Sequence, residues 1–335
     1  MYGANTDLFR FAPELTAGFE GKRVFITGAG KDGGIGQAFA LAAGLNGAAS
    51  VGVHFHRSYQ DGFDLVTALQ DAGVNAFPVQ ADVTNLRDLW ASRSYVIEQM
   101  GGKPPSLVIC NSGLTEAGYQ FGRALKEQAD EPMAVRRARV RQHFIDNLEE
   151  SRLVLDTKID GFLASTHLWA GEAVYHNEPV QFVYVSSRQA IDPGPAVPGY
   201  ALSNWAVLAL PKVLEVNLGR SAEHVSAFSV LFPFIRTGMT DEYADNERVW
   251  GRWQPRMLEP HECAEAFARL MARPTDELRN GMFELMVDPR DVASQTSTTS
   301  EPAGGSVPID VTWKRVEIEV QEQNLVWSAE NPLQF

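Results

Sequence analysis

The fold can be inferred from one stretch, Thr27-Gly28-Ala29-Gly30-Lys31-Asp32-Gly33-Gly34-Ile35-Gly36. A short apolar run ends at Thr27, and a helical pattern, Gly36–Leu45, follows. Glycines let a backbone turn sharply and approach a pyrophosphate, and the start of the next helix attracts phosphates with its free N–H groups. The alternative is a glycine-rich turn that binds nothing, but a strand before and a helix after favour a dinucleotide site. The residues expected against the cofactor are Gly28, Gly30, Lys31, Gly34, Ile35 and Gly36.

Strand-like and helix-like segments alternate from Lys22 to about Val287, which is typical of a mostly parallel sheet covered by helices. Continuous apolar runs suit strands that are buried on both faces. We expect an α/β fold with a Rossmann-type doubly wound parallel sheet of about seven strands, in a single domain over residues 1–290. The expected strands are Arg23–Thr27, Ser50–Phe55, Ala76–Gln80, Leu107–Cys110, Gln181–Val185, Val225–Leu231 and Met282–Val287.

Three segments depart from this alternation. Gly113–Glu150 is long and polar for a connection, so we expect it to hold a helix of its own. Residues 291–335 are expected to form a linker and a C-terminal extension, since Ser294–Ser306 is rich in Ser, Thr, Gly and Pro. Val311–Val320 alternates roughly as a strand, which packs either on the domain or on a partner chain.

Composition excludes several classes of protein. The formal net charge is −13, from 29 basic and 42 acidic residues, so nucleic acid and anionic membranes would repel the chain. The two cysteines, Cys110 and Cys263, are too few for a disulfide scaffold and fit a reducing compartment. No apolar run reaches about 18 residues, and the first 25 residues lack a signal pattern. We therefore expect a cytoplasmic protein that binds neither nucleic acid nor membrane.

The second expected strand ends in residues 54–58, HFHRS, where a dinucleotide fold holds the adenosine ribose. An acidic residue there binds a 2′-hydroxyl, whereas an arginine accepts a 2′-phosphate. Arg57 and Lys31 therefore favour NADP (NADPH) over NAD, the alternative being that Arg57 is a solvated loop residue. We interpret His54 and His56 as structural and expect no metal, since no further ligand set is evident.

The order of several motifs resembles that of the short-chain dehydrogenase/reductase family, from about Lys22 to Val287. The resemblance implies that Asp82, with Val83 beside it, binds the adenine edge and that Asn111 supports the sheet and the cofactor. It also implies that Thr237 contacts the nicotinamide amide. The landmarks are Thr27-Gly28, Gly34-Ile35-Gly36, Asp82-Val83, Asn111-Ser112-Gly113, Ser187 and Tyr200.

Ser187 and Tyr200 carry the chemistry that carbonyl reduction needs, because a ketone takes a hydride on carbon and a proton on oxygen. A tyrosine donates that proton well when a nearby cation lowers its pKa, and a serine hydroxyl holds the carbonyl oxygen. The family pattern Tyr-x-x-x-Lys is broken here, since Asn204 occupies the lysine position. Lys158 stands where most of the family has an asparagine, so the two residues have exchanged places. This exchange is similar to the ketoreductase domains of modular polyketide synthases, and the glycine loop resembles that of type I fatty acid synthases.

These features predict an NADPH-dependent reductase of a β-ketoacyl thioester, free or borne on an acyl carrier protein, in fatty acid or polyketide synthesis. One alternative is a reductase or dehydrogenase for another small-molecule ketone or secondary alcohol, and another is a catalytically silent dinucleotide binder. The family resemblance also implies a homo-oligomer. We interpret the basic run Arg136–Arg141 as a solvated helix face paired with Glu149 and Glu150, the alternative being a docking site for an acidic carrier. Met239–Arg256 is expected to be a mobile lid, with Trp250 and Trp253 either lining an acyl pocket or packing internally.

Overall fold

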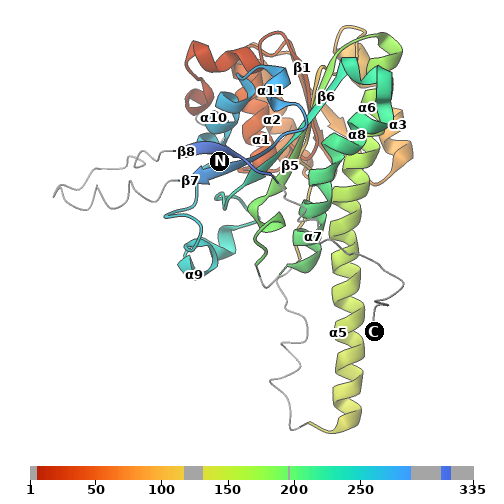
Figure 1. The fold of residues 1–335 in the computed structure, drawn as a ribbon, viewed down its shortest axis with the longest axis vertical. Coiled ribbons are helices and arrows are strands. Elements are labelled where there is room, and N and C mark those ends of the chain that lie inside the picture. Colours follow the sequence, from red (N-terminus) through yellow and green to blue (C-terminus); the bar gives the residue numbers. More distant parts are fainter. Residues whose placement is uncertain (1–5, 117–130, 195–196, 288–310, 318–335) are drawn as a thin grey trace, which may run out of the picture.

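The computed structural model describes residues 6–116, 131–194, 197–287 and 311–317 (Figure 1). Its strands are β1 (Arg23–Ile26), β2 (Ser50–Phe55), β3 (Ala76–Gln80), β4 (Leu107–Cys110), β5 (Val180–Ser187), β6 (Val225–Phe232), β7 (Met282–Val287) and β8 (Val311–Arg315). They form one sheet in the order β3-β2-β1-β4-β5-β6-β7-β8. Strands β1 to β7 are parallel. The chain reverses its direction of progress between β1 and β4, and ligands bind at this point in doubly wound sheets.

Helices cover both faces of the sheet (Figure 1). Alternate side chains of β1 point to opposite faces, so Val24 and Ile26 belong to one core and Phe25 to the other. Phe39 and Phe267 lie in the first core, and Trp169 lies in the second. The main helices are α1 (Ile35–Leu45), α2 (Tyr59–Asp71), α3 (Leu86–Gln99), α5 (Met133–Leu155), α6 (Gly161–His176), α7 (Pro198–Ala206), α8 (Leu210–Leu218) and α10 (Pro260–Met271).

Shorter helical segments connect these elements. Between α5 and α6 the helix widens for one turn into a π-helical segment, η4 (Asp156–Asp160). Two short α-helices are α9 (Glu247–Trp250) and α11 (Thr275–Leu278). The 3-10 segments are η2 (Thr6–Phe9), η3 (Pro13–Gly18), η5 (Arg188–Ala190), η6 (Val207–Ala209), η7 (Gly219–His224) and η8 (Asp241–Tyr243).

The expected architecture is confirmed, with each of the seven expected strands present within one or two residues. An eighth strand, β8, pairs antiparallel with β7. The strand pattern at Val311–Val320 therefore packs, as far as residue 317, on its own domain. The Trp313 side chain fixes it there, because the indole N–H donates to the Ala266 carbonyl of α10 at 2.7 Å. The expected linker, Ser294–Ser306, lies outside the described residues.

The helix expected within Gly113–Glu150 is present as α5, which has 23 residues. Figure 1 shows α5 projecting from the edge of the sheet where α7 and α9 also lie. Residues 117–130 of this segment lie outside the described part of the chain. None of the helices in the described ranges combines the length and the apolar character needed to cross a membrane.

Candidate active site

The glycine loop lies against the carboxyl end of β4. Gly28 has a φ of +67°, and a Cβ there would lie 2.8 Å from Ser112 Cα. A Cβ on Gly36 would lie 2.5 Å from both the Asn111 amide nitrogen and the Gly28 carbonyl. The Asn111 Nδ2 donates to the carbonyls of Thr27, at 3.2 Å, and of Gly28, at 3.1 Å. Asn111 therefore holds the loop in place, as expected of a residue that supports the sheet.

The start of α1 is open to a phosphate. Its N-cap, Gly34, offers no side chain, and no acidic residue occupies the first turn. Gly30 packs closely against Phe55, because a Cβ at position 30 would lie 2.5 Å from Phe55 Cβ. Ile35 begins the helix and packs against the core. A bare, uncapped helix N-terminus beside a glycine loop is suited to binding a pyrophosphate.

His54 supports the same loop from β2. Its Nδ1 accepts a hydrogen bond from the Gly28 N–H at 3.2 Å, and its carbonyl accepts one from the Ala29 N–H at 2.8 Å. Burial lowers the pKa of His54 to about 4, so the ring is neutral and accepts rather than donates at Nδ1. His56 instead faces Asp82, at 3.7 Å. Among the described residues, no three His, Cys, Asp or Glu side chains converge on a possible metal site.

The two cations that the sequence places near the tip of β2, Arg57 and Lys31, lie beside acidic groups. Arg57 is exposed directly after the strand. Lys31 is also exposed, and its ammonium lies 3.9 Å from Asp61 Oδ2. Asp61 also accepts a hydrogen bond from the Asp32 N–H at 3.2 Å, so an acidic group lies beside the glycine loop. Sequence reasoning missed this carboxylate because it lies in the first turn of α2 rather than at the strand tip.

Asp82 and Val83 follow β3 and have different surroundings. Burial opposes ionisation of Asp82, but hydrogen bonds from the Thr84 N–H at 2.9 Å and hydroxyl at 2.8 Å, with the charges of His56 and Arg57, lower its pKa. Val83 is buried, and a Cβ on Gly161 would lie 2.7 Å from its Cγ2. The Asp82 carboxylate thus stays ionised at the edge of the site, while Val83 packs against the start of α6.

Ser187, Tyr200 and Asn204 come together as expected. Ser187 ends β5 and is 9% exposed, and α7 places Tyr200 and Asn204 one turn apart. The Ser186 hydroxyl donates to the Asn204 carbonyl at 2.8 Å, which joins the strand to the helix. Burial raises the pKa of Tyr200 above its ordinary value, and hydrogen bonding to the Ser187 and Asn204 side chains opposes this rise. The Asn204 Oδ1 atom is buried without a hydrogen-bond partner in the described residues.

Lys158 reaches the interior from the π-helical segment η4. Its side chain is 4% exposed, and its ammonium lies 5.1 Å from the centre of the Phe162 ring. A Cβ on Gly113 would lie 3.6 Å from Lys158 Nζ, so the ammonium sits at the carboxyl end of β4. Burial lowers the pKa of Lys158 to about 7. Such single π turns are frequent at functional sites, and this one turns a cation towards the switch point of the sheet.

Thr237 lies in the turn that follows β6. Its N–H donates to Thr240 Oγ1 at 3.0 Å, closing the turn after β6. A Cβ on the neighbouring Gly238 would lie 3.8 Å from Lys31 Cε, so this turn and the glycine loop are adjacent. The turn after β6 therefore lies beside the glycine loop, and a contact between Thr237 and the nicotinamide amide stays a prediction.

The segment expected to be a lid is anchored by specific contacts. Trp253 stacks on Phe234, with ring centres 5.5 Å apart, and its indole N–H donates to Asp192 Oδ2. Arg252 also pairs with Asp192, at 3.1 Å. Trp250 is buried and donates its N–H to the Tyr243 carbonyl at 3.2 Å, which is internal packing. Asp192, in the loop between Ser187 and Tyr200, was missed from the sequence because no motif marks it.

The basic run occupies the exposed half of α5. Arg139 pairs with Glu131 at 2.8 Å, so at this residue the partner is not one of the two expected glutamates. Arg137 and Arg141 are exposed. The run therefore forms a largely solvated helix surface on the projecting part of the molecule.

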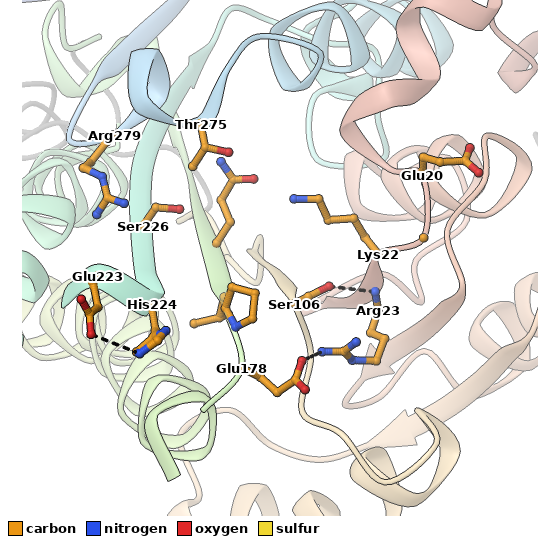
Figure 2. Close-up of a pocket in the computed structure, with 14 residues that line it drawn as sticks. Glu20, Lys22, Arg23, Ser106, Glu178, Glu223, His224, Ser226, Thr275 and Arg279 are labelled. Atoms are coloured by element: carbon orange, nitrogen blue, oxygen red, sulfur yellow. Dashed lines mark hydrogen bonds and ion pairs between the residues drawn. The ribbon is translucent and has the colours of Figure 1, made fainter. Parts of the chain in front are cut away.

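A cavity of about 370 Å³ lies at the amino ends of the parallel strands, away from the candidate active site at their carboxyl ends (Figure 2). Its walls include the amino ends of β1, β5 and β6, and none of the predicted site residues lines it. The Lys22 ammonium points into it, and burial lowers the pKa of that group. Arg23 and Glu178 pair at 3.0 Å in its wall. Because Ser187 lies at the carboxyl end of β5, this cavity is separate from the candidate active site.

Solved structures share this fold. A short-chain type dehydrogenase/reductase from Mycobacterium marinum is 22% identical, with a TM-score of 0.58 over 78% of this chain and 91% of that chain. A 3-oxoacyl-(acyl-carrier protein) reductase from Brucella melitensis is 20% identical, with a TM-score of 0.62 over 82% and 94%. A short chain dehydrogenase from Burkholderia cenocepacia in complex with NADP is 19% identical, with a TM-score of 0.62 over 79% and 96%. At such identities the likeness is one of fold alone.

Comparison of sequences shows the family to which the chain belongs. A short chain dehydrogenase of Emericella nidulans is 31% identical over 111 residues, which are 33% of this chain and 40% of that protein. A short chain dehydrogenase of Claviceps purpurea matches to the same extent, so the chain spans about two fifths of the length of these curated relatives. The profile of the family described as short chain dehydrogenase matches residues 22–248, which is more than half of the chain. The chain therefore belongs to the short chain dehydrogenase family.

Proposed function

We propose that the chain is an NADPH-dependent carbonyl reductase whose substrate is a β-ketoacyl thioester in fatty acid or polyketide synthesis. The observation that carries the proposal is the convergence of Ser187, Tyr200 and Asn204 at the carboxyl end of β5, with the buried Lys158 at the exit of β4. These are the groups that proton donation to a carbonyl oxygen requires, and they lie at the carboxyl ends of β4 and β5, next to the switch point of the sheet.

The residues present fit a phosphorylated dinucleotide. Gly28 and Gly36 are packed so closely against their neighbours that a Cβ at either position would clash. The start of α1 has no side-chain cap. Lys31 and Arg57 supply positive charge where a 2′-phosphate would lie. Bound there, NADPH would supply the hydride. Asp61 reduces the positive charge near Lys31, so Arg57 is the residue on which the preference for NADPH over NADH chiefly depends.

The side chains divide the proton chemistry among them. The Ser187 hydroxyl holds the substrate's carbonyl oxygen, and the Tyr200 hydroxyl gives that oxygen its proton. Since burial raises the pKa of Tyr200, the charge of Lys158 is needed to stabilise the phenolate that remains. The unpartnered Asn204 Oδ1 is suited to orient the water that returns a proton to Tyr200.

Two observations support the substrate class. The exchanged positions of Lys158 and Asn204 resemble ketoreductase domains, and a protein of the same fold is a 3-oxoacyl-(acyl-carrier protein) reductase. This fold hosts many reactions, so the chemistry of the site rather than the fold must identify the substrate. The proposed partner is a substrate borne on an acidic acyl carrier protein, which the exposed arginines of α5 would attract. Reversing the charges of Arg137 and Arg139 should then raise KM for carrier-bound substrate only, and an equal rise for a small free thioester would contradict this docking.

The test is NADPH oxidation with a panel of β-ketoacyl thioesters and plain ketones, with NADH in parallel. We expect turnover of the thioesters, a preference for NADPH, and loss of that preference in Arg57→Ala. Turnover restricted to plain ketones would favour reduction of another ketone or secondary alcohol. NADPH binding without turnover of any member would favour a catalytically silent dinucleotide binder, and either result would reject the thioester.

A further inference from the structure

A buried carboxylate lies at the start of the helix that carries Tyr200. Glu116 lies six residues beyond the end of β4, and its side chain is 1% exposed. Glutamate is almost never buried to this extent unless its oxygens are paired. In the described part of the chain its partners are three hydrogen-bond donors rather than a cation. The sequence gives no sign of this arrangement, since Glu116 belongs to no motif of the site.

Two of these donors are backbone groups in the first turn of α7. The Gly199 N–H donates to Glu116 Oε1, and the Tyr200 N–H donates to Oε2 at 3.0 Å. The N-cap residue of α7, Val197, has no side chain that can accept them. The first N–H groups of a helix have no partner within it, and a negative charge near them is stabilising. Glu116 therefore caps α7 from another part of the chain, through the backbone of Tyr200 itself.

Gly199 makes this contact possible. A Cβ at position 199 would lie 2.4 Å from Glu116 Oε1 and 3.1 Å from Ser151 Cα. Any residue larger than glycine would therefore push the carboxylate away from the helix. Gly199 has no positive φ, so an alanine there is excluded by the carboxylate and not by the backbone conformation.

The third donor connects α7 to the helix that leads to Lys158. The Ser151 hydroxyl of α5 donates to Glu116 Oε1 at 3.0 Å. Ser151 is buried and precedes Lys158 by about two helical turns on a continuous helical path. One carboxylate thus connects the β4 exit loop to α7, which carries Tyr200, and to α5, which continues into the segment that carries Lys158.

We infer that Glu116 is a positioning residue for Tyr200, which fixes the first turn of α7 and hence the phenol against Ser187. The inference rests on the proposed reductase for its kinetic consequences. Its structural content, that Glu116 sets the surroundings of the Tyr200 hydroxyl, is independent of the substrate.

The test compares Glu116→Gln with the wild-type chain. The amide keeps the shape of the carboxylate but turns an N–H towards one of the three donors, so at least one bond is lost. We expect kcat to fall about 10- to 100-fold, because small displacements of a reacting group cost that much. The Kd for NADPH should stay within about twofold, since no glycine-loop contact changes. Equal losses in kcat and in NADPH binding would overturn the inference.

A second readout needs no turnover. Ultraviolet absorbance titration of each protein, minus that of the same protein carrying Tyr200→Phe, isolates the ionisation of Tyr200. In Glu116→Gln the midpoint should fall by about half a unit or more, because burial holds the pKa of Tyr200 up and a released phenol gains water. An unchanged midpoint would overturn the inference even if the reductase proposal holds. A shifted midpoint in a protein that reduces no carbonyl would support the inference while the proposed function fails.

Two further variants remove the remaining ambiguity. Gly199→Ala keeps the charge but displaces the carboxylate, so it should reproduce both effects if Glu116→Gln does not fold. Glu172→Gln is the matched control, because Glu172 is also a buried carboxylate but pairs with Arg93 of α3. It should lower stability without shifting the Tyr200 midpoint or kcat. The same kinetic loss in the control would show a general effect of disturbing buried carboxylates and would contradict a specific role for Glu116.

Discussion

The burial of the Lys158 ammonium lowers the stability of the folded protein. A lysine titrates near 10.5 when solvated, and burial lowers the pKa of Lys158 to about 7 in the folded protein. Between these values the unfolded chain binds more protons than the folded one, so this group makes stability rise with pH. Below about pH 7 the residue is charged in both states, and the full cost of burying it is present.

Replacing Lys158 should therefore stabilise the protein and inactivate it. Lys158→Met keeps a long unbranched side chain and removes the buried charge that lies over Phe162. We expect the free energy of unfolding at pH 6 to rise by about 3 to 5 kcal/mol, with the gain shrinking as pH rises towards 10.5. In the same variant kcat should fall steeply. Urea unfolding at several pH values, beside a turnover assay, checks both, and near-normal turnover would refute the exchange of Lys158 with Asn204.

His54 also makes stability rise with pH, but over a more acidic range than Lys158. Its pKa is about 4 in the folded protein against 6.5 when solvated, so the unfolded chain takes up a proton first as pH falls. Stability should drop by about 2 to 3 kcal/mol between pH 6.5 and 4.5 from this group alone. In His54→Gln the drop should be smaller by that amount, measured by chemical unfolding at the two pH values. Equal drops in both proteins would show that the ring is not held neutral.

At the scale of elements, the glycine loop depends on close approach to β4. Gly36→Ala would place a Cβ 2.5 Å from Asn111 Nδ2, so either the loop or Asn111 must move. We expect a loss of about 1 to 3 kcal/mol in stability and about tenfold or more in NADPH affinity, measured by thermal unfolding and by fluorescence titration.

Gly171→Ala is the matched control for that substitution. It also changes a helical glycine to alanine, but a Cβ there meets nothing within 4 Å. It should leave affinity unchanged and raise stability by up to about 1 kcal/mol. Unchanged NADPH affinity in Gly36→Ala would contradict the location of the cofactor site.

The sequence predicts some elements of the site much better than others. The glycine loop, Ser187 and Tyr200 are found because their chemistry needs fixed residue types at fixed positions after strands. Glu116 and Asp192 are not found, since each acts through contacts with residues far along the chain. The segment after β6 is the clearest case. Composition suggests a lid there, but only the fold shows that Trp253 stacks on Phe234 and reaches Asp192.

At the scale of the whole molecule, the parallel sheet was predictable because buried strands need continuous apolar runs. The role of the eighth strand was not, since an alternating pattern shows which face is buried but not against which partner. Contacts of Trp313 show that this strand packs on its own domain. The Trp313 ring lies against Phe232, with ring centres 5.7 Å apart, and its N–H donates to the Ala266 carbonyl of α10.

Trp313→Ala should accordingly destabilise the entire domain. It removes an aromatic contact with β6 and the indole hydrogen bond to the Ala266 carbonyl of α10. We expect the free energy of unfolding to fall by about 2 to 4 kcal/mol in urea. Thr312→Ala, on the exposed side of the same strand, should change stability by less than about 0.5 kcal/mol. Similar small effects in both variants would mean that β8 contributes little to the domain.

The central claim is that Tyr200 gives the proton in carbonyl reduction, and a matched pair of tyrosine variants tests it most directly. Tyr184 is fully buried in β5 and hydrogen-bonds Thr166 at 2.9 Å, so Tyr184→Phe removes a buried hydroxyl outside the site. With NADPH and a β-ketoacyl thioester, Tyr200→Phe should lower kcat by about 100-fold or more, while Tyr184→Phe keeps it within about threefold. Comparable turnover in the two variants would contradict the account.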